Sequence, residues 1–355
     1  MNKLVIAAAG SGKTEFLVNS ALENKNNVLI TTFTDNNAAE IKHRIYSKNG
    51  CIPSRITIMP WFSFMLTHGI KPYQDVFYSE DIKGIVFPGG QSGKFTKEKD
   101  ISHYITSDGK IYSDKIAKLF LKLNKMVNGR MIENINKLYP QIMIDEIQDI
   151  SGYDLEIVES LFNSKSEMLC VGDPRQGVFS TDKGAKNKKY SKSHITDFFK
   201  TKVKELELDN SSLNTNYRCT SDICTLSNSI YPDFQAVLPG NNYNNDHLGC
   251  FVVKPADVDK YLQKFNPIQL RLSKMTKVNE KYNALNFGMS KGLSFDRVLI
   301  YPTKKMLDWI LLSKGLNSEE TMAKLYVAIT RARYSVAFVC DYEESFNHSI
   351  IKKYK

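Results

Sequence analysis

A glycine-rich loop near the start of the chain has the residue types that hold a phosphate. Residues 7–14 are Ala-Ala-Ala-Gly-Ser-Gly-Lys-Thr, and only Ala7 departs from the strict phosphate-loop pattern. Two glycines let the backbone curl so that its N–H groups face phosphate oxygens. The lysine would reach the terminal phosphates, and the threonine hydroxyl would bind Mg²⁺. We therefore predict an ATP site formed by Ala9, Gly10, Ser11, Gly12, Lys13 and Thr14.

Two adjacent carboxylates further along the chain could complete this chemistry. The apolar run 142–144 ends at Asp145 and Glu146. In a nucleotide hydrolase, the first carboxylate holds Mg²⁺ and the second orients and deprotonates the attacking water. Such a pair is common by chance, but here it follows a phosphate loop and continues into Gln148 and Asp149. Together the two segments predict ATP hydrolysis with Mg²⁺.

Short apolar runs alternate with helical patterns around these residues. We expect strands at 4–7, 28–33, 56–58, 141–144 and 168–171, and helices at 15–23, 36–46 and from 61 to 66. A second alternating region has strands at 249–253, 297–301 and 336–339 and a helix at 319–333. Strands that alternate with helices indicate parallel sheets covered on both faces. The prediction is an α/β fold with two tandem domains, residues 1–205 and 206–355.

Two segments interrupt this pattern. Residues of about 70–135 contain several glycine turns and then a helical stretch at 114–127, so we interpret them as an insertion in the first domain. Within it, residues 84–110 match no functional pattern. A lysine-rich run later in the chain could contact phosphates or form a solvated loop, and both interpretations stay open for Lys183, Lys186, Lys188, Lys189 and Lys192.

Composition limits the classes of partner. The 355 residues carry a net charge of +10, which suits a polyanion, chiefly nucleic acid or an anionic membrane, or serves solubility alone. No run approaches the roughly 20 apolar residues that span a bilayer, and the first residues lack a signal-peptide pattern. We therefore expect a cytoplasmic protein that binds no membrane. The six scattered cysteines indicate reduced thiols rather than zinc ligands or disulfides.

Taken together, these segments resemble the superfamily 1A helicases of the UvrD/Rep/PcrA group. Seven motifs match in the family's order, at residues 7–14, 31–41, 145–149, 172–176, 213–218, 290–296 and 326–333. The resemblance implies two RecA-like P-loop NTPase domains that couple ATP hydrolysis to movement on single-stranded DNA, with 3′ to 5′ as the expected direction. A small-molecule kinase would leave three motifs without roles: Gly-Asp-Pro-Arg-Gln, Asn-Tyr-Arg and Thr-Arg-Ala-Arg.

The resemblance also implies roles for residues outside the phosphate loop. Gln176 would sense the γ-phosphate, while Arg218 and Arg331 would reach it from the second domain. Arginine suits this task because its planar fork is always charged and bonds two oxygens. Gly292 would contact the nucleotide. The predicted catalytic set is thus Lys13, Glu146, Gln176, Arg218 and Arg331; for each of the two arginines, a surface ion pair is the alternative.

The same resemblance predicts a DNA track with aromatic side chains. Its residues would be Phe33, Thr34, Trp61, Phe62 and Phe179. Base stacking on aromatic rings tolerates any sequence, which suits a motor that steps along DNA. The alternative for the aromatic residues is a place in the core, and for Trp61 and Phe62 the sequence favours neither interpretation.

Four departures from the family pattern affect the expected activity. Few residues precede Ala7, so we expect no upstream glutamine motif to read adenine. Ser294 and Thr181 replace a glutamate and a tryptophan. The interval between Arg218 and Gly292 is too short for the large accessory domain of bigger relatives, which favours translocation over duplex unwinding. The alternative is a nucleotide-gated DNA-binding or regulatory subunit that switches a partner nuclease; a replication or repair protein is another possible partner.

Overall fold

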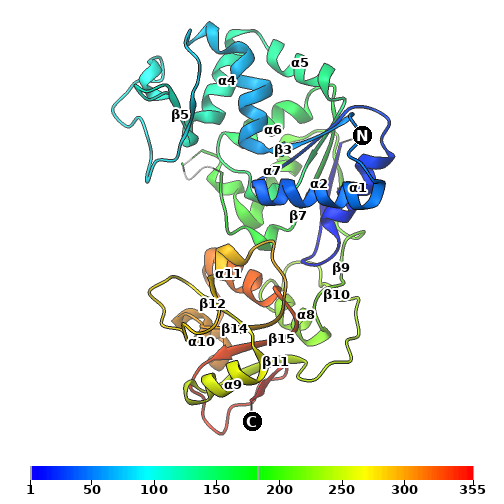
Figure 1. Ribbon diagram of the computed structural model, residues 1–355, viewed down its shortest axis with the longest axis vertical. Coiled ribbons are helices and arrows are strands. Elements are labelled where there is room, and N and C mark those ends of the chain that lie inside the picture. The colour runs from blue at the N-terminus through cyan, green and yellow to red at the C-terminus, as the bar shows by residue number, and fades with distance from the viewer. Residues whose placement is uncertain (1, 182–183, 185, 355) are drawn as a thin grey trace. The chain divides into compact units, whose positions relative to one another are not determined.

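The computed structural model describes residues 2–181, 184 and 186–354. The chain divides into two compact units (Figure 1). The first comprises Met1–Val5, Lys13–Pro174 and Ser180–Asp209, and the second comprises Ile6–Gly12, Arg175–Phe179 and Asn210–Lys355. Two short segments that precede residue 205 therefore cluster with the second unit. The domain limits drawn from the sequence stay a prediction.

A six-stranded sheet forms the centre of the first unit in the described part of the chain. Its order is β3-β2-β6-β7-β1-β8. The pairs β2–β3, β2–β6, β6–β7 and β1–β8 are parallel. Every residue of β2 and β6 is buried, so both faces of the sheet are covered, as the apolar runs predict. The strands are β1 (Lys3–Ile6), β2 (Val28–Thr32), β3 (Ile56–Pro60), β6 (Gln141–Ile144), β7 (Glu167–Gly172) and β8 (Glu207–Asp209).

One helix of this unit, α2 (Asp35–Asn49), has caps at both ends that explain its limits. The side chain of Thr34 accepts a hydrogen bond from the Asn37 N–H (3.2 Å), and Gly50 ends the same helix with φ of 75°. The helix expected at 36–46 therefore continues to Asn49. The α-helices are α1 (Lys13–Glu23), α2 (Asp35–Asn49), α3 (Trp61–Phe64), α4 (Ile116–Met126), α5 (Arg130–Leu138), α6 (Asp154–Phe162) and α7 (Ile195–Lys202).

The helix expected to begin at 61–66 is present, and it changes type along its length. After the four residues of α3, the chain continues as a π-helical segment, Met65–Ile70. Gly69 in this segment lies against the buried ring of Phe120 in α4: a Cβ atom at Gly69 would be 2.2 Å from the Phe120 Cε2 atom. The two segments thus pack more closely than any residue larger than glycine permits.

The expected insertion is an ordered part of the first unit. It contains α4, α5 and a parallel strand pair, β4 (Gly84–Val86) and β5 (Lys110–Tyr112), and Figure 1 shows β5, α4 and α5 together at one side of this unit. The carboxylate of Asp114 accepts hydrogen bonds from the backbone N–H (3.1 Å) and the hydroxyl (2.6 Å) of Ser92. The helix expected at 114–127 begins as α4 at Ile116.

The second unit repeats the α/β plan. Its sheet has the order β13-β12-β14-β15-β11-β16 among the described residues, with parallel pairing throughout. This confirms the predicted fold class of two domains with parallel sheets. The strands are β11 (Gly249–Val253), β12 (Ile268–Arg271), β13 (Ala284–Asn286), β14 (Phe295–Ile300), β15 (Ala332–Val339) and β16 (Ile351–Lys353), and β9 (Thr215–Asn216) pairs with β10 (Leu238–Pro239). The helices are α8 (Ser221–Asn228), α9 (Val258–Phe265), α10 (Lys304–Leu312) and α11 (Glu319–Ile329).

The helix expected at 319–333 is too long. The α11 helix ends at Ile329, and β15 already begins at Ala332. The Thr330 hydroxyl donates to the Tyr326 carbonyl (2.8 Å), and the Arg331 Nε atom donates to the Val327 carbonyl (3.1 Å). These side chains satisfy carbonyls of the last helical turn. Arg331 consequently lies in the turn between α11 and β15.

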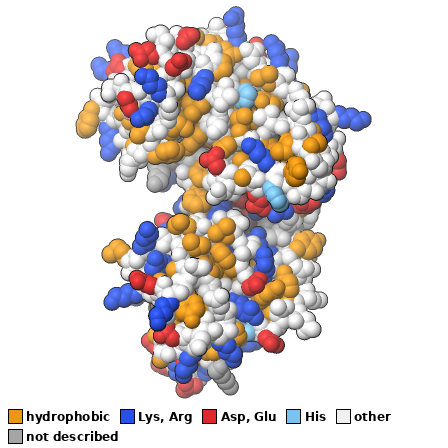
Figure 2. Space-filling model, viewed as in Figure 1, with side chains coloured by type: hydrophobic (Ala, Val, Ile, Leu, Met, Phe, Trp, Pro, Cys, Tyr) orange, Lys and Arg blue, Asp and Glu red, His pale blue; other side chains and the backbone are white. Residues whose placement is uncertain are grey.

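The surface of the protein mixes charges of both signs. On the face shown in Figure 2, lysine and arginine side chains are interspersed with acidic and hydrophobic ones. The net charge of +10 therefore forms no uniform basic surface on this face, and any contact with a polyanion must come from local groups. Within the described residues, no helix is long and apolar enough to cross a bilayer.

We predict that Gly69→Ala destabilises the first unit. The added methyl group would lie 2.2 and 2.4 Å from two ring atoms of the fully buried Phe120. Overpacking of this kind costs about 1–3 kcal/mol of the free energy of unfolding, which a lower urea midpoint would report. Gly89→Ala is the matched control, since nothing lies within 4 Å of its added methyl group. Equal midpoints for the two variants would show that the ring can move aside.

Candidate nucleotide-binding and catalytic site

The phosphate loop has the curled backbone that its glycines predict. Gly10 and Gly12 have φ of 72° and 86°, a region that side chains disfavour. At Gly10 space is also limiting, because a Cβ atom would lie 2.5 Å from the Asn216 Oδ1 atom and 2.7 Å from the Arg218 Cβ atom. The loop residues up to Gly12 belong to the second unit, as do Asn216 and Arg218. Lys13 and Thr14, at the end of the loop, belong to the first unit. Glycine is therefore required at position 10 for two reasons.

The segment 213–218 holds the loop through its backbone. The Ala8 N–H donates to the Leu213 carbonyl (2.8 Å), and the Tyr217 N–H donates to the Gly10 carbonyl (3.0 Å). A third contact comes from the buried Arg175, whose Nη2 atom donates to the Ala7 carbonyl (3.4 Å). No role for Arg175 is evident from the sequence alone, although it stands beside Gln176 in the Gly-Asp-Pro-Arg-Gln motif.

The loop also presents a buried hydroxyl that lacks a partner. Ser11 is 5% exposed, and its Oγ atom forms no hydrogen bond with any described residue. Buried polar atoms in proteins are nearly always bonded, so such an atom calls for an explanation. A phosphate oxygen within the loop would supply the missing bond. The small, buried side chains of residues 7–9 leave room for that approach.

In the first unit, the sheet topology brings the other predicted residues to one edge. Lys13 and Thr14 begin α1, the helix that follows β1. Asp145 and Glu146 follow β6, which is separated from β1 only by β7. Because the carboxyl ends of parallel strands meet at the same edge, both segments lie on that edge. Oxygen ligands suit Mg²⁺, so the Thr14 hydroxyl and the buried Asp145 carboxylate fit this ion.

Glu146 has an unusual backbone conformation, and a glutamine bonds its carboxylate. Its φ of 56° and ψ of 43° lie in the left-handed region, and its N–H donates to the Asp145 Oδ1 atom (2.9 Å). The Gln148 Nε2 atom donates to the Glu146 carboxylate, while the Gln148 Oε1 atom accepts from the Asp173 N–H (3.0 Å). Gln148 therefore positions the expected catalytic carboxylate, a role that the sequence did not reveal.

Within the second unit, Arg331 meets Gln176. The Arg331 Nη2 atom donates to the Gln176 Oε1 atom (3.1 Å), and its Nη1 atom donates to the Leu293 carbonyl (3.2 Å). The side chain of Arg331 is 2% exposed, so a surface ion pair is the wrong interpretation for it. The structure thus joins residues from three separate motifs in one hydrogen-bonded group.

Arg218 approaches the same turn. Its Nη1 atom donates to the Thr330 carbonyl (3.2 Å), while the Thr330 hydroxyl accepts from the Arg331 Nη2 atom (3.2 Å). Both predicted arginines therefore converge on Thr330. Gly292 directly precedes Leu293, whose carbonyl accepts from Arg331. It has φ of 83° and lies in a turn in which the Leu293 N–H donates to the Ser290 carbonyl (3.1 Å).

The residues predicted to contact DNA have different environments. Phe33 and Phe62 of the first unit and Phe179 of the second are half-buried. Thr34 uses its hydroxyl to cap α2. The Lys291 Nζ atom lies 5.6 Å from the centroid of the Phe179 ring. Contact of these four residues with DNA stays a prediction.

Trp61 is a core residue, so the prediction of a DNA contact is wrong for it in this structure. Its side chain is 1% exposed, and the indole N–H donates to the Asp154 carboxylate at 2.7 Å. The ring also packs 5.4 Å from the ring centroid of Phe64. A tryptophan near a strand end can point into the core or toward a surface that contacts DNA. Packing against the surrounding helices determines which of the two it does.

The lysine-rich run is only partly described. Lys183 lies outside the described residues, and Lys186 forms an ion pair with Glu156 (2.5 Å). Lys188, Lys189 and Lys192 lie in short helical turns before α7. Contact with phosphates stays a prediction for these lysines.

Comparison with known proteins shows which family the chain resembles. The model of the UvrD/REP helicase N-terminal domain matches residues 1–78 and 97–196. The DNA helicase II of Haemophilus influenzae is 21% identical over 305 residues, covering 70% of this chain and 39% of the relative. The Gabija protein GajB of Bacillus cereus is 29% identical over 259 residues, which cover 68% of this chain and 49% of GajB.

A solved structure supports the fold alone. The complex of Arterivirus nonstructural protein 10 (helicase) with DNA aligns with a TM-score of 0.50 at 13% identity, over 97% of this chain and 61% of that one. The chain spans at most about half the length of the two curated relatives named above. The family model covers half of the chain, including the phosphate loop and the Asp145–Glu146 pair. The chain therefore belongs to the UvrD/REP helicase family.

Proposed function

We propose that this protein hydrolyses ATP and uses the energy to move along single-stranded DNA from 3′ to 5′. The observation that carries the proposal is the buried hydrogen bond between Arg331 and Gln176, because it joins a charged group suited to a γ-phosphate with a segment that bears a predicted DNA contact. Membership of the UvrD/REP helicase family supports the same activity.

Each group of residues in the site has its own role in ATP hydrolysis. The loop N–H groups, the Ser11 hydroxyl and Lys13 bind the phosphates. Mg²⁺ held by Thr14 and Asp145 would neutralise developing charge on the phosphate oxygens. Glu146 takes the proton of the attacking water, and Gln148 keeps its carboxylate in position.

Coupling to DNA follows from a competition for one guanidinium group. A γ-phosphate is a stronger partner for Arg331 than the neutral amide of Gln176. Binding of ATP would therefore weaken the bond to Gln176, and hydrolysis would restore it. Gln176 belongs to a short turn, closed by the Val178 N–H and the Gln176 carbonyl (2.8 Å), that continues into Phe179. A change at the nucleotide thus reaches a ring predicted to stack on a base.

A second candidate function is a nucleotide-gated subunit that switches a partner, such as a nuclease or a replication or repair protein. It is favoured by the short interval between Arg218 and Gly292, which among the described residues holds the strands β10 to β13, the helices α8 and α9 and two short 3₁₀ turns. Such a subunit would bind DNA and hydrolyse ATP without stepping. Length dependence of movement separates the two functions.

We predict that single-stranded DNA stimulates ATP hydrolysis and that Lys13→Ala and Glu146→Gln abolish it. Loss of the general base alone should lower the rate by roughly 10²–10⁴-fold. Steady-state phosphate release with and without DNA measures both effects. The same hydrolysis rate in Lys13→Ala as in the wild type would contradict the assignment of the site.

We predict that the protein reaches a fluorescent marker on the 5′ end of a DNA strand after a lag that grows with strand length. Single-turnover stopped-flow fluorescence measures the lag, and a marker on the 3′ end serves as the control. A lag that is independent of length would favour the nucleotide-gated subunit. A lag that grows only for the 3′ marker would reverse the proposed direction.

We predict that Arg331→Lys lowers ATP hydrolysis by roughly 10³-fold or more, as loss of an arginine at the γ-phosphate does in other NTPases. Lysine keeps the charge but cannot bond Gln176, Leu293 and Val327 at once. Arg333→Lys is the matched control, since Arg333 is exposed and pairs with Asp296 (3.0 Å). Equal rates in both variants, with unchanged unfolding midpoints, would remove Arg331 from the catalytic set.

A further inference from the structure

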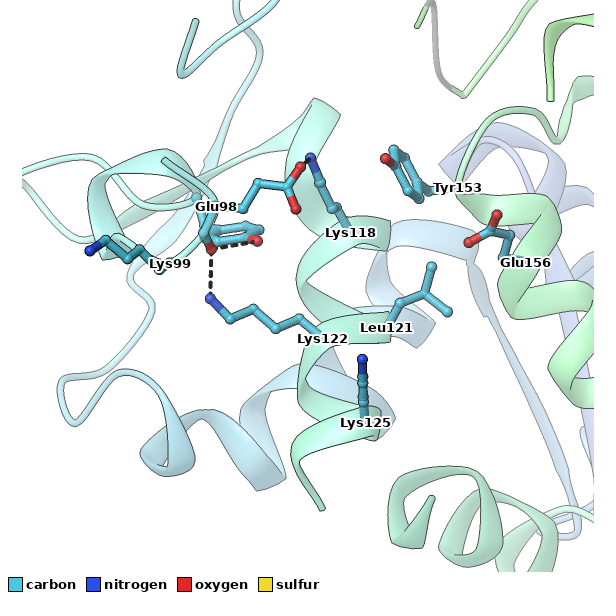
Figure 3. A pocket seen from close by; sticks show the side chains of 9 residues that line it. Glu98, Lys99, Lys118, Leu121, Lys122, Lys125, Tyr153 and Glu156 are labelled. Atoms are coloured by element: carbon cyan, nitrogen blue, oxygen red, sulfur yellow. Dashed lines mark hydrogen bonds and ion pairs between the residues drawn. The ribbon is translucent and has the colours of Figure 1, made fainter. Parts of the chain in front are cut away.

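A basic pocket lies in the part of the first unit for which the sequence suggested no function. It has a volume of about 460 Å³ and is lined by α4, by the start of α6 and by residues 98–104 of the insertion. Figure 3 shows Lys118, Lys122 and Lys125 extending from one helix, with Tyr153 and Glu156 on a neighbouring helical segment. None of its lining residues belongs to the seven motifs.

The lysines of the pocket share one face of α4. Lys118, Lys122 and Lys125 are spaced by four and three residues, which places them on one side of a helix. The opposite side is buried and apolar, with Leu119, Phe120 and Leu123 among its residues. On this buried side, Phe120 lies close to Gly69 of the π-helical segment. The lysine face consequently points away from the core, and Lys99 adds a fourth cation from the loop.

Both carboxylates of the pocket are already paired. Glu98 forms an ion pair with Lys118, and Glu156 pairs with Lys186 at 2.5 Å. Lys122 has less freedom: its Nζ atom donates to the Glu98 carbonyl (2.7 Å) and lies 3.6 Å from the centroid of the Phe77 ring. Burial lowers the pKa of Lys122 from its ordinary value, while the coulombic influence of Glu98 acts in the opposite direction.

The positive charge of the pocket is therefore not balanced. The side chains of Lys99 and Lys125 are exposed and form no ion pair or hydrogen bond with the residues that the structure describes. Together with Lys122 they leave an excess of cations around one cavity. Such a group favours an anionic ligand with several charges.

The aromatic rings of the pocket are not available for base stacking. Tyr104 is 1% exposed and donates its hydroxyl to the Glu98 carbonyl (3.0 Å). The Tyr153 ring has two ammonium groups near its centroid, Lys118 at 5.4 Å and Lys186 at 5.6 Å. A ligand here would thus be recognised by charge and not by its bases. Phosphate contacts of this kind position nucleic acid without reading its sequence.

We propose that this pocket binds the phosphate backbone of nucleic acid through Lys99, Lys122 and Lys125, as a contact separate from the ATP-coupled track. The proposal rests on the proposed function only in taking nucleic acid as the polyanion. It gives residues 98–104, within the uninterpreted segment 84–110, a role. The backbone could be that of a single strand or of a duplex beside it.

The test is equilibrium DNA binding by the full chain, without nucleotide, over a series of salt concentrations. Fluorescence anisotropy compares a labelled oligothymidylate with a labelled duplex that carries a single-stranded tail. The variant is Lys99→Gln with Lys125→Gln, two exposed residues outside the catalytic set. The matched control is Lys25→Gln with Lys165→Gln, which removes the same charge from exposed turns that precede β2 and β7 in the same unit.

The variant should bind on the order of tenfold more weakly than the control, and its salt slope should fall by about 0.7 per lysine for a single strand or about 0.9 for a duplex. Weaker binding of both ligands assigns the contact to the single strand, and weaker binding of the tailed duplex alone assigns it to the duplex. Affinities and slopes equal to those of the control would overturn the proposal.

A second readout separates this proposal from the motor function. At saturating DNA, the rate of ATP hydrolysis by the variant should equal that of the wild type, because neither lysine belongs to the catalytic set. If the wild type shows no DNA-stimulated hydrolysis but the variant still binds DNA more weakly than the control, the motor function fails and the phosphate contact stands. If the wild type binds neither DNA ligand, the phosphate contact is overturned.

Discussion

The burial of one guanidinium group, that of Arg331, constrains the second unit. Arg331 keeps its charge at any pH that proteins experience, so in a buried place each N–H must find an acceptor. It finds them in Gln176, Leu293 and Val327, which come from three motifs far apart in sequence. The end of α11 at Ile329 and the short turn before β15 follow from this requirement, because a longer helix would carry Arg331 elsewhere.

A neutral glutamine has a similar task in each unit. Gln176 accepts a hydrogen bond from the guanidinium of Arg331, and Gln148 donates one to the carboxylate of Glu146 while accepting one from the Asp173 N–H. An amide can donate and accept at once without adding charge to a buried site. In both units the amide therefore orients a charged group that the proposed hydrolysis of ATP requires.

The insertion extends the first unit by close packing rather than by a new core. Gly69 permits the Phe120 ring of α4 to lie against the π-helical segment. The apolar side of α4 is consequently buried and its lysines line the pocket next to Tyr153. The apolar packing of α4 thus leaves its lysines at the surface of the insertion. The family model does not match residues 79–96, which lie within this region.

Features that depend on short stretches of the chain can be predicted from the sequence alone. The phosphate loop, the Asp145–Glu146 pair, the alternation of strands and helices and the order of the motifs all depend on short stretches, so their patterns are legible without a structure. Features that depend on contacts between distant residues are evident only in the folded protein. It buried Trp61 against Asp154, gave Gln148 its place beside Glu146 and enclosed Arg331. The physical reason is that burial and hydrogen-bond partners are set by packing across the sheets and helices, which no local pattern specifies.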